Sequence, residues 1–596
     1  MSAPNRNTLW ARIFVDELVR AGLEAVCIAP GSRSTPLTLA FAEHPGVTVY
    51  SLLDERGAAF FALGMALAGQ KPVAVLCTSG TATANFYPAV IEANYAQVPL
   101  LVLTTDRPHE ARHSGANQTI DQVKMYGDHV RWFVDVTPPE AHPASLTLRA
   151  LRSLAGRAMA AATGLPPGPV QLNFPFRKPL EPTLAPADGT EKAAQVEGRS
   201  DQRPFTRITR GVCLPSPTQL DLLAELIQEN PRGLIVCGPR CPGGRFPEAV
   251  TRLAGLAGYP ILADALSGVR FGTHVAEAAG MILGGYDTFL QADFTARMEP
   301  PEMILRFGAM PISQALMNYL VGASSARQVA IHESGSWQDE NYTLSDFMWA
   351  EPEAVCELTA ARLEGAELKP RDAGWLANFK QAEGRTWQVV ETTRSDRFFE
   401  GTILAEVVEA MPDEALLYVA SSLPVRHLDQ FTPPGPASLQ VLANRGASGI
   451  DGTIASALGA AAATERPLVL VMGDLAFYHD MNSLLALKRC GVKATIVLIN
   501  NNGGGIFHRL PIAQFEPPFT ELFVTPHDLN FEPVVRVFGA DYIAASTREE
   551  VRRALSQALA ADNSHVIEVS TDAVLHEQVR REVMEAVALA LRQRGA

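Results

Sequence analysis

Short apolar runs alternate with segments of helical periodicity along the first third of the chain. Four of the runs predict buried strands, namely Leu23–Ala29, Val47–Leu53, Pro72–Thr78 and Val98–Thr104. Helical periodicity predicts helices over Glu55–Gln70 and Thr83–Gln97. Strands that alternate with helices form a parallel, doubly wound sheet, and such sheets bind ligands at the C-terminal ends of their strands.

The same alternation returns twice along the chain. The later runs predict strands at Gly233–Cys237, Pro260–Ala263, Met303–Phe307, Gln328–Ile331, Leu416–Ala420, Leu439–Leu442, Pro467–Met472, Ala494–Ile499 and His565–Val569. We therefore predict α/β domains at residues 1–180, 211–365 and 401–596, a linker at 181–210, and a linker with a helix at 366–400. Three α/β units of similar size suggest a duplication of one fold.

Composition narrows the class of protein. The 596 residues are 47% hydrophobic and 19% charged, values typical of a packed globular chain. The net charge of −14 argues against nucleic-acid binding, so an anionic substrate requires a local arginine cluster. The apolar runs are too short to span a membrane, the N-terminal residues lack a signal-peptide pattern, and seven scattered cysteines favour reduced thiols. We expect a cytoplasmic protein.

Two polar motifs follow neighbouring predicted strands in the last third of the chain. Gly473-Asp474 ends one strand, and Asn500-Asn501-Asn502-Gly503-Gly504 ends the next. Asn501 lies 27 positions after Asp474. Carboxylate, amide and carbonyl oxygens suit Mg²⁺, which keeps open positions for phosphate oxygens. Either motif alone reads better as a helix cap or a turn. Together at this spacing they predict a site for a metal ion and a diphosphate.

Gly-Asp followed at this distance by Asn-Asn resembles the cofactor signature of thiamine-diphosphate-dependent enzymes, although Leu475 stands where that family usually has glycine. The resemblance implies an α/β fold of three doubly wound parallel-sheet domains, in the order pyrimidine-binding, central, diphosphate-binding. It implies thiamine diphosphate with Mg²⁺ (or Mn²⁺) held by Asp474, the Asn501 side chain and the Gly503 carbonyl. The other implied cofactor-binding residues are Pro30, Ile450, Gly473, Leu475 and Ile506.

The same resemblance implies a catalytic, cofactor-binding glutamate in the first domain. Glu55 stands where a predicted strand turns into a helix, and a carboxylate there is also favoured by the helix dipole alone. In the family, a carboxyl group bonded to the cofactor's pyrimidine drives the tautomer shift that lets the cofactor deprotonate itself. Glu55 matches the position of this catalytic glutamate in the family.

Seven longer strings resemble one branch of this family, which serves menaquinone and phylloquinone biosynthesis. They are Ala29–Pro36, Asp54–Phe60, Thr78–Asn85, Thr105–Pro108, Gly115–Gln118, Asn444–Gly452 and Asn500–Gly504. The resemblance implies that 2-oxoglutarate loses CO₂ and that the succinyl carbanion adds in 1,4 fashion to isochorismate. It also implies a homodimer or homotetramer with active sites between subunits. The acidic net charge and the short apolar runs predict no nucleic-acid or membrane partner.

Both implied substrates are dicarboxylates, so their pocket needs fixed cations and neutral donors. The chain matches substrate-facing positions of the branch at Ser32, Arg33, Asn117, Gln118, Ser422, Arg426, Arg445 and Phe507. Ile450 matches the residue that holds the cofactor bent. For each arginine, a surface charge or a structural ion pair is the commoner role. One departure is that the branch often has a central-domain cation where this chain has Gln314 and Ala315.

Three alternatives remain. Another thiamine-dependent 2-keto-acid decarboxylase or carboligase would share Glu55 and Asp474 but not the arginine set. A flavin or nicotinamide oxidoreductase is disfavoured, because no Gly-x-Gly-x-x-Gly follows the first strand. A non-catalytic protein of this fold would be expected to have lost Glu55 and the metal ligands.

Overall fold

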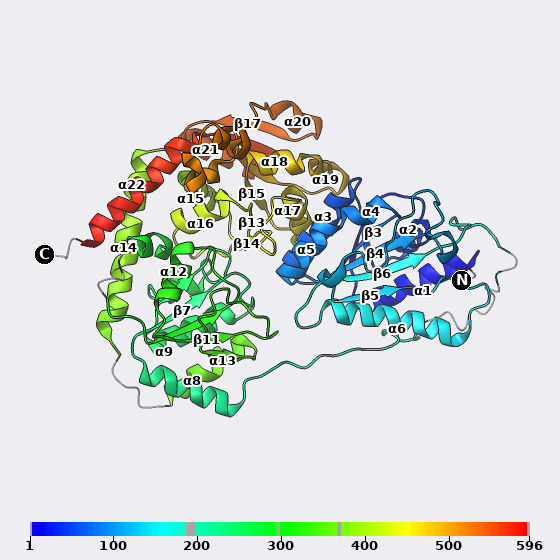
Figure 1. Cartoon of the computed structure of the whole chain (residues 1–596), viewed down its shortest axis with the longest axis horizontal. Helices are drawn as coiled ribbons and strands as arrows, with labels where there is room; N and C mark the ends of the chain where they lie inside the picture. Colours follow the sequence, from blue (N-terminus) through cyan, green and yellow to red (C-terminus); the bar gives the residue numbers. More distant parts are fainter. Residues whose placement is uncertain are drawn as a thin grey trace.

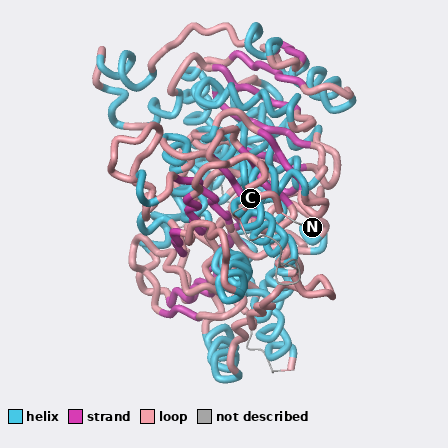
Figure 2. Tube along the Cα trace, turned by 90° about the vertical axis from the view of Figure 1, so that its right-hand side faces the viewer, coloured by secondary structure: helices cyan, strands magenta, loops and turns pink. Residues whose placement is uncertain are grey.

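The chain folds into three parallel six-stranded sheets with helices packed between and around them (Figure 1). A computed structural model describes residues 3–185, 188, 198–292, 294, 298–365 and 371–592. Every pair of neighbouring strands is parallel, which confirms the predicted α/β class. In the turned view of Figure 2, helices flank the strands. The predicted domain boundaries stay predictions, and parts of both predicted linkers, at 186–187, 189–197 and 366–370, lie outside the described residues.

The first sheet has the strand order β2-β1-β3-β4-β6-β5. Its strands are β1 (Ala25–Ile28), β2 (Thr48–Ser51), β3 (Val73–Cys77), β4 (Leu100–Asp106), β5 (Trp132–Asp135) and β6 (Val170–Pro175), and its helices are α1 (Arg6–Arg20), α2 (Thr35–Glu43), α3 (Glu55–Gly69), α4 (Thr81–Asn85), α5 (Tyr87–Ala96) and α6 (Ser145–Ala162). All four predicted strands of this region are present. The prediction that Val47–Leu53 is buried was wrong, because β2 is an edge strand that pairs with β1 alone and is largely exposed.

The helix predicted over Thr83–Gln97 is two helices. α4 ends at Asn85, and α5 begins at Tyr87 with Pro88 in its first turn. Proline has no amide hydrogen and is favoured at the start of a helix rather than inside one. The chain therefore begins a new helix at this position.

The third sheet repeats the strand order of the first, as β14-β13-β15-β16-β18-β17. Its strands are β13 (Leu416–Val419), β14 (Gln440–Leu442), β15 (Leu468–Gly473), β16 (Thr495–Asn500), β17 (Asp541–Ala545) and β18 (His565–Ser570). Its helices are α15 (Glu400–Ala410), α16 (Leu423–Phe431), α17 (Thr453–Thr464), α18 (Asp474–Asp480), α19 (Leu485–Arg489), α20 (Glu532–Val537), α21 (Arg548–Ala560) and α22 (Ala573–Arg592). In β15 and β16, Gly473 pairs with Ile499, so Asp474 and Asn501 leave neighbouring strands at the same edge.

The central sheet has a different order, β12-β11-β10-β7-β8-β9, so only the first and third sheets share a topology. Its strands are β7 (Gly233–Cys237), β8 (Ile261–Ala263), β9 (Ile282–Leu283), β10 (Met303–Phe307), β11 (Arg327–Ile331) and β12 (Asp346–Met348). Its helices are α8 (Pro217–Glu229), α9 (Phe246–Ala257), α10 (His274–Glu277), α11 (Tyr286–Gln291), α12 (Gln314–Gly322) and α13 (Pro352–Glu364), and α14 (Ala373–Asp396) follows. This is the order typical of dinucleotide-binding sheets, but the glycine fingerprint of those sheets is missing from the sequence.

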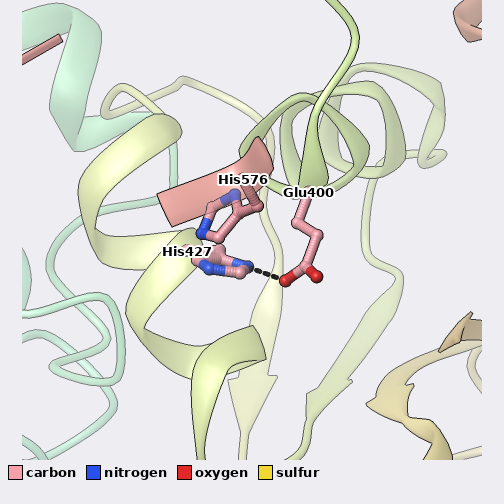
Figure 3. A group of neighbouring side chains, drawn as sticks. All are labelled: Glu400, His427 and His576. Carbon is pink, nitrogen blue, oxygen red and sulfur yellow. Dashed lines mark ion pairs between the residues drawn. The ribbon is translucent and has the colours of Figure 1, made fainter. Parts of the chain in front are cut away.

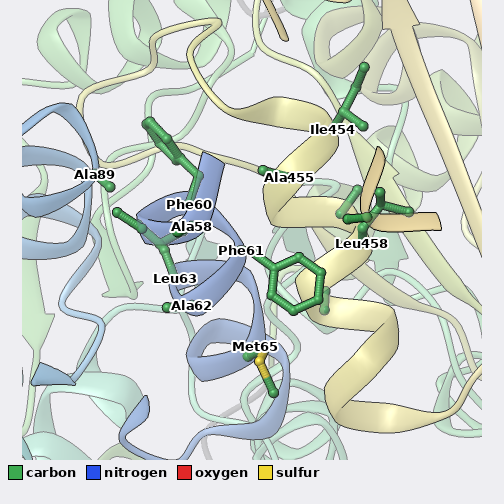
Figure 4. Close-up of a cluster of buried hydrophobic side chains, with 14 of the residues drawn as sticks. Ala58, Phe60, Phe61, Ala62, Leu63, Met65, Ala89, Ile454, Ala455 and Leu458 are labelled. Carbon is green, nitrogen blue, oxygen red and sulfur yellow. The ribbon is translucent and has the colours of Figure 1, made fainter. Parts of the chain in front are cut away.

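The first and third sheets share one hydrophobic core, which forms where α3 packs on α17 (Figure 4). A Cβ on Gly64 would lie 1.8 Å from the Ser456 carbonyl oxygen, and a Cβ on Gly459 would lie 2.0 Å from the Phe61 carbonyl oxygen. Only glycine permits so close an approach of two helix backbones. Among the described residues, no helix is both long and apolar enough to cross a membrane.

Candidate active site

The three predicted metal ligands lie together at the C-terminal edge of the third sheet. Asp474 begins α18, and its Oδ2 accepts a hydrogen bond of 2.9 Å from the backbone nitrogen of Gly503. Its Oδ1 accepts from the Leu475 nitrogen at 2.7 Å. Gly503 has a φ of +141°, and a Cβ there would lie 2.1 Å from the Val524 carbonyl oxygen. The loop after β16 can therefore reach Asp474 only with glycine at this position.

Asn501 supplies an unpaired oxygen to this group. Its Nδ2 donates to Glu400 Oε1 at 2.7 Å, whereas its Oδ1 is buried and has no hydrogen-bond partner among the described residues. A buried acceptor without a partner is costly, and nearly all such groups in proteins are satisfied. A divalent cation bound between Asp474 and Asn501 would satisfy it. The residues present therefore fit Mg²⁺ or Mn²⁺.

The charge of the site also fits a cation. Burial raises the pKa of Asp474, and the backbone hydrogen bonds from Gly503 and Leu475 oppose that rise. His527 Nε2 lies 3.3 Å from Asp474 Oδ2. A bound cation would further stabilise the ionised carboxylate of Asp474.

Glu55 occupies the first turn of α3, on the side of the first domain that faces α18. Asp54 caps this helix by accepting from the Gly57 nitrogen, and its other oxygen accepts from Asn482 Nδ2. On the other side of Glu55, Arg56 donates to the His479 carbonyl oxygen at 2.7 Å. The two neighbours of Glu55 thus attach the start of α3 to the segment that follows Asp474, and Glu55 itself is half-buried.

Three of the first-domain strings that resemble the family pack on one another. The backbone nitrogen of Arg33 donates to Thr78 Oγ1, and a Cβ on Gly31 would lie 2.3 Å from Thr78 Cβ. Ser79 Oγ donates to the Gln118 carbonyl oxygen, and Gln118 Nε2 donates back to the Ser79 carbonyl oxygen. The quoted strings that begin at Ala29, Thr78 and Gly115 therefore form one surface.

Two of the predicted substrate-binding residues have positive φ angles. Gln118 has a φ of +54°, and Ser422, the residue before α16, has a φ of +74° with a ψ of −125°. Such backbone costs about 1–3 kcal/mol for a residue other than glycine, and it gathers at functional sites. Both loops therefore hold their side chains on a constrained backbone.

Arg426 and Arg445 lie close enough in the third domain for their charges to interact. Burial lowers the pKa of Arg445, and the neighbouring Arg426 lowers it further. Arg426 NH1 donates to the Ser422 carbonyl oxygen at 2.6 Å. The loop that carries Arg445 is attached to α5 by Glu92, which accepts from the backbone nitrogens of Gly446 and Ala447. Two half-buried, mutually repelling cations can bind an anionic group, although the carboxylates of Asp264 and Glu92 offset part of the charge of Arg445.

The chain alone does not bring Arg33 to this pair. The Arg33 side chain is buried in the first domain and donates to the Phe176 carbonyl oxygen at 2.7 Å.

The other predicted cofactor- and substrate-binding residues differ in how far their side chains are exposed. Pro30, Ser32 and Asn117 are exposed, whereas Ile450, Leu475, Ile506 and Phe507 are half-buried. In the central domain, Gln314 stands where the family branch often has a cationic residue. Its Nε2 donates to Asn318, and it supplies no positive charge.

A buried polar cluster behind Asn501 is missing from the sequence-based predictions. Glu400, His427 and His576 come from α15, α16 and α22, and Figure 3 shows their side chains converging. Arg509 NH2 lies 3.3 Å from His427 Nε2 and 3.2 Å from His576 Nε2. Burial raises the pKa of Glu400 to about 7 and lowers the pKa of His576 to about 3. No local motif marks these residues, since they meet only when α15, α16 and α22 pack together.

Comparison with known proteins identifies the family of all three domains. Residues 10–125 match the N-terminal TPP binding domain of thiamine pyrophosphate enzymes, residues 199–419 match the middle domain, and residues 427–569 match the C-terminal TPP binding domain. Thiamine pyrophosphate is another name for thiamine diphosphate.

Full-length relatives share half of the sequence. A protein of Roseiflexus castenholzii is 51% identical over 96% of this chain and 97% of its own length, and one of Haloarcula marismortui is 47% identical over 99% of both. A Halobacterium salinarum protein is 48% identical over 98% of this chain and 99% of its own. All three carry the name 2-succinyl-5-enolpyruvyl-6-hydroxy-3-cyclohexene-1-carboxylate synthase. The chain belongs to this synthase family, within the thiamine-diphosphate-dependent enzymes.

Proposed function

We propose that the protein decarboxylates 2-oxoglutarate and transfers the remaining succinyl unit to isochorismate, with CO₂ as the second product, in menaquinone or phylloquinone biosynthesis. The observation that carries the proposal is the buried group of Asp474, Gly503 and Asn501 Oδ1, which has no hydrogen-bond partner among the described residues. The arginine pair of the same domain adds to it. The name of the relatives supports the choice of substrates.

In this proposal, Asp474, the Asn501 side chain and the Gly503 carbonyl would hold Mg²⁺ or Mn²⁺, and the open metal positions would take the cofactor's diphosphate. When bound, thiamine diphosphate supplies a nucleophilic carbon and stores the electron pair released with CO₂. Glu55 would hold a proton at the pyrimidine nitrogen of the bound cofactor and would so promote formation of that nucleophile. Ile450 would keep the cofactor bent.

The residues around the arginine pair would bind the substrate carboxylates. Arg426 and Arg445 supply charge-assisted hydrogen bonds, and Ser422 presents its hydroxyl from a constrained backbone. Ser32, Arg33, Asn117 and Gln118 would act from the first domain, and Phe507 would form an apolar wall that limits access of water. We propose a homodimer or homotetramer in which the first domain of one subunit faces the third domain of another, so that these two sets meet.

The test is a two-substrate assay of the purified protein with Mg²⁺ and thiamine diphosphate. We expect isochorismate to be consumed only when 2-oxoglutarate is present, with one CO₂ released for each isochorismate consumed. Release of CO₂ from 2-oxoglutarate at the full rate without isochorismate would instead favour a simple decarboxylase. Consumption of isochorismate alone would exclude the proposal.

Replacing Arg445 with methionine is expected to lower kcat/KM by about tenfold to a hundredfold, because a charge-assisted hydrogen bond to a substrate carboxylate contributes about 1.5–3 kcal/mol. Steady-state kinetics with each substrate varied in turn shows which carboxylate is affected. Arg466 precedes β15 at the opposite end of the sheet, so R466M is the control and should leave kcat/KM unchanged. Equal effects of the two variants would contradict a substrate role for Arg445.

A further inference from the structure

We infer that Glu400 is a positioning residue, which turns the Asn501 amide so that its oxygen, rather than its NH₂ group, faces the metal. This inference deepens the proposed function and rests on metal binding by Asp474 and Asn501. Glu400 begins α15 and is 1% exposed. It lies 101 residues from Asn501 in the sequence.

The hydrogen bonds of Glu400 fix the direction of the amide. Glu400 Oε1 accepts from Asn501 Nδ2 at 2.7 Å and from Thr571 Oγ1 at 3.1 Å. Because this one oxygen accepts from both donors, it holds the NH₂ side of the amide and leaves Oδ1 pointing away. An amide without this partner can turn over and present its NH₂ group to the cation, which is repulsive. Residues that orient metal ligands in this way typically change metal affinity by about 10–100-fold when they are replaced.

The cluster behind Glu400 keeps the carboxylate in place. Glu400 Oε2 lies 3.8 Å from His427 Nδ1, as drawn in Figure 3. His427 and His576 pack against each other with ring centroids 4.4 Å apart, and Arg509 lies against the Nε2 atoms of both. Arg509 closes the η5 turn (Gly505–Arg509), which also carries Ile506 and Phe507. The cluster therefore joins the metal ligand to the loop that is expected to line the cofactor.

Glu400, His427 and His576 are also residue types that bind metals, and their ligand atoms lie within 4.8 Å of one another. Two features favour the positioning role over a second metal site. Glu400 Oε1 already accepts from Asn501 and Thr571, and the Arg509 guanidinium places a positive charge beside both imidazoles. A cation at the cluster would have to displace or repel that guanidinium.

The test compares E400D with E400Q, because the two changes separate charge from position. Aspartate keeps the charge but withdraws the carboxylate from Asn501, whereas glutamine keeps an acceptor at the same reach and loses the charge. We expect E400D to weaken Mn²⁺ binding by about tenfold or more and E400Q to retain the wild-type affinity. Electron paramagnetic resonance of free Mn²⁺, with thiamine diphosphate present, measures this affinity without turnover.

Glu406 provides a matched control, since it is an equally buried glutamate on the same helix that pairs with Arg394, Arg548 and Arg552 instead. E406D and E406Q should bind Mn²⁺ like the wild type, even where the melting temperature falls. Stronger loss of affinity in E400Q than in E400D would show a role for charge and overturn the inference, as would wild-type affinity in E400D.

Stoichiometry supplies the remaining outcome. The wild type should bind one Mn²⁺ per chain, and a second equivalent that disappears in H576Q would make the cluster a metal site and overturn the positioning role. If the wild type itself binds no Mn²⁺, the proposed metal site fails. If the wild type binds Mn²⁺ but the variants do not follow the expected order of affinities, only the positioning role of Glu400 fails. The two failures can therefore be told apart.

Discussion

Glu55→Gln is expected to lower kcat by about 10²- to 10⁴-fold while the protein folds normally, since this is the usual contribution of a positioned acid–base group. Glutamine is nearly the same shape as glutamate but cannot exchange a proton with the pyrimidine nitrogen. The half-buried side chain lies in the first turn of α3, where the cap by Asp54 is unaffected by the change. Stopped-flow or coupled assays of CO₂ release measure kcat, and circular dichroism checks the fold.

Glu43 supplies the control for this change, because its exposed carboxylate pairs with Arg12 at the end of α2. E43Q should keep full activity. An E55Q variant with wild-type kcat would remove Glu55 from the proposed acid–base role. Loss of activity together with loss of structure would point instead to a structural role at the start of α3.

Asp474→Asn is expected to lower the affinity for the divalent metal by at least about a hundredfold, and with it the affinity for thiamine diphosphate. Asparagine removes the only carboxylate among the three predicted ligands, and hard cations bind through charged oxygens. It also brings an NH₂ group against the backbone nitrogens of Gly503 or Leu475, which are donors themselves. Isothermal titration calorimetry with thiamine diphosphate at fixed Mg²⁺ measures the loss.

Asp541 begins β17 at the opposite end of the same sheet, and D541N is the matched control. It should bind metal and cofactor like the wild type. If D474N retains cofactor affinity, the metal ligands lie elsewhere and the interpretation of the motif is wrong. If higher Mg²⁺ concentrations restore cofactor binding in D474N, the defect lies in metal affinity, as expected.

The sequence predicts strands well where burial on both faces makes them continuously apolar. β7 is continuously apolar and has the predicted bounds, and β10 also has them although Arg306 interrupts its apolar run. β6 was not predicted because Gln171 and Asn173 interrupt its apolar pattern. Both are fully buried, and Asn173 bonds to Asp106 and Asp135. A polar residue that is satisfied by distant partners has no signature in its own neighbourhood.

Part of the candidate site could be predicted from the sequence, and part could not, because some of its residues meet only through contacts between distant segments. Asp474 and Asn501 follow neighbouring strands, so the topology of a parallel sheet brings them together. Glu400 and His527 contact those two residues from segments that carry no motif. Glu400 even falls in the segment predicted to link two domains. Only the packing of α15 on the third sheet places its carboxylate behind Asn501.

The core shared by α3 and α17 has a consequence for biosynthesis of the chain. α3 ends at Gly69, whereas its partner helix begins at Thr453. At about 5–20 residues per second, a ribosome needs on the order of tens of seconds to make the intervening chain. During that interval the nascent first domain exposes the surface of α3 that Phe60 and Phe61 occupy in the finished core. The protein is therefore expected to depend on molecular chaperones during translation, most of all when the ribosome pauses before α17.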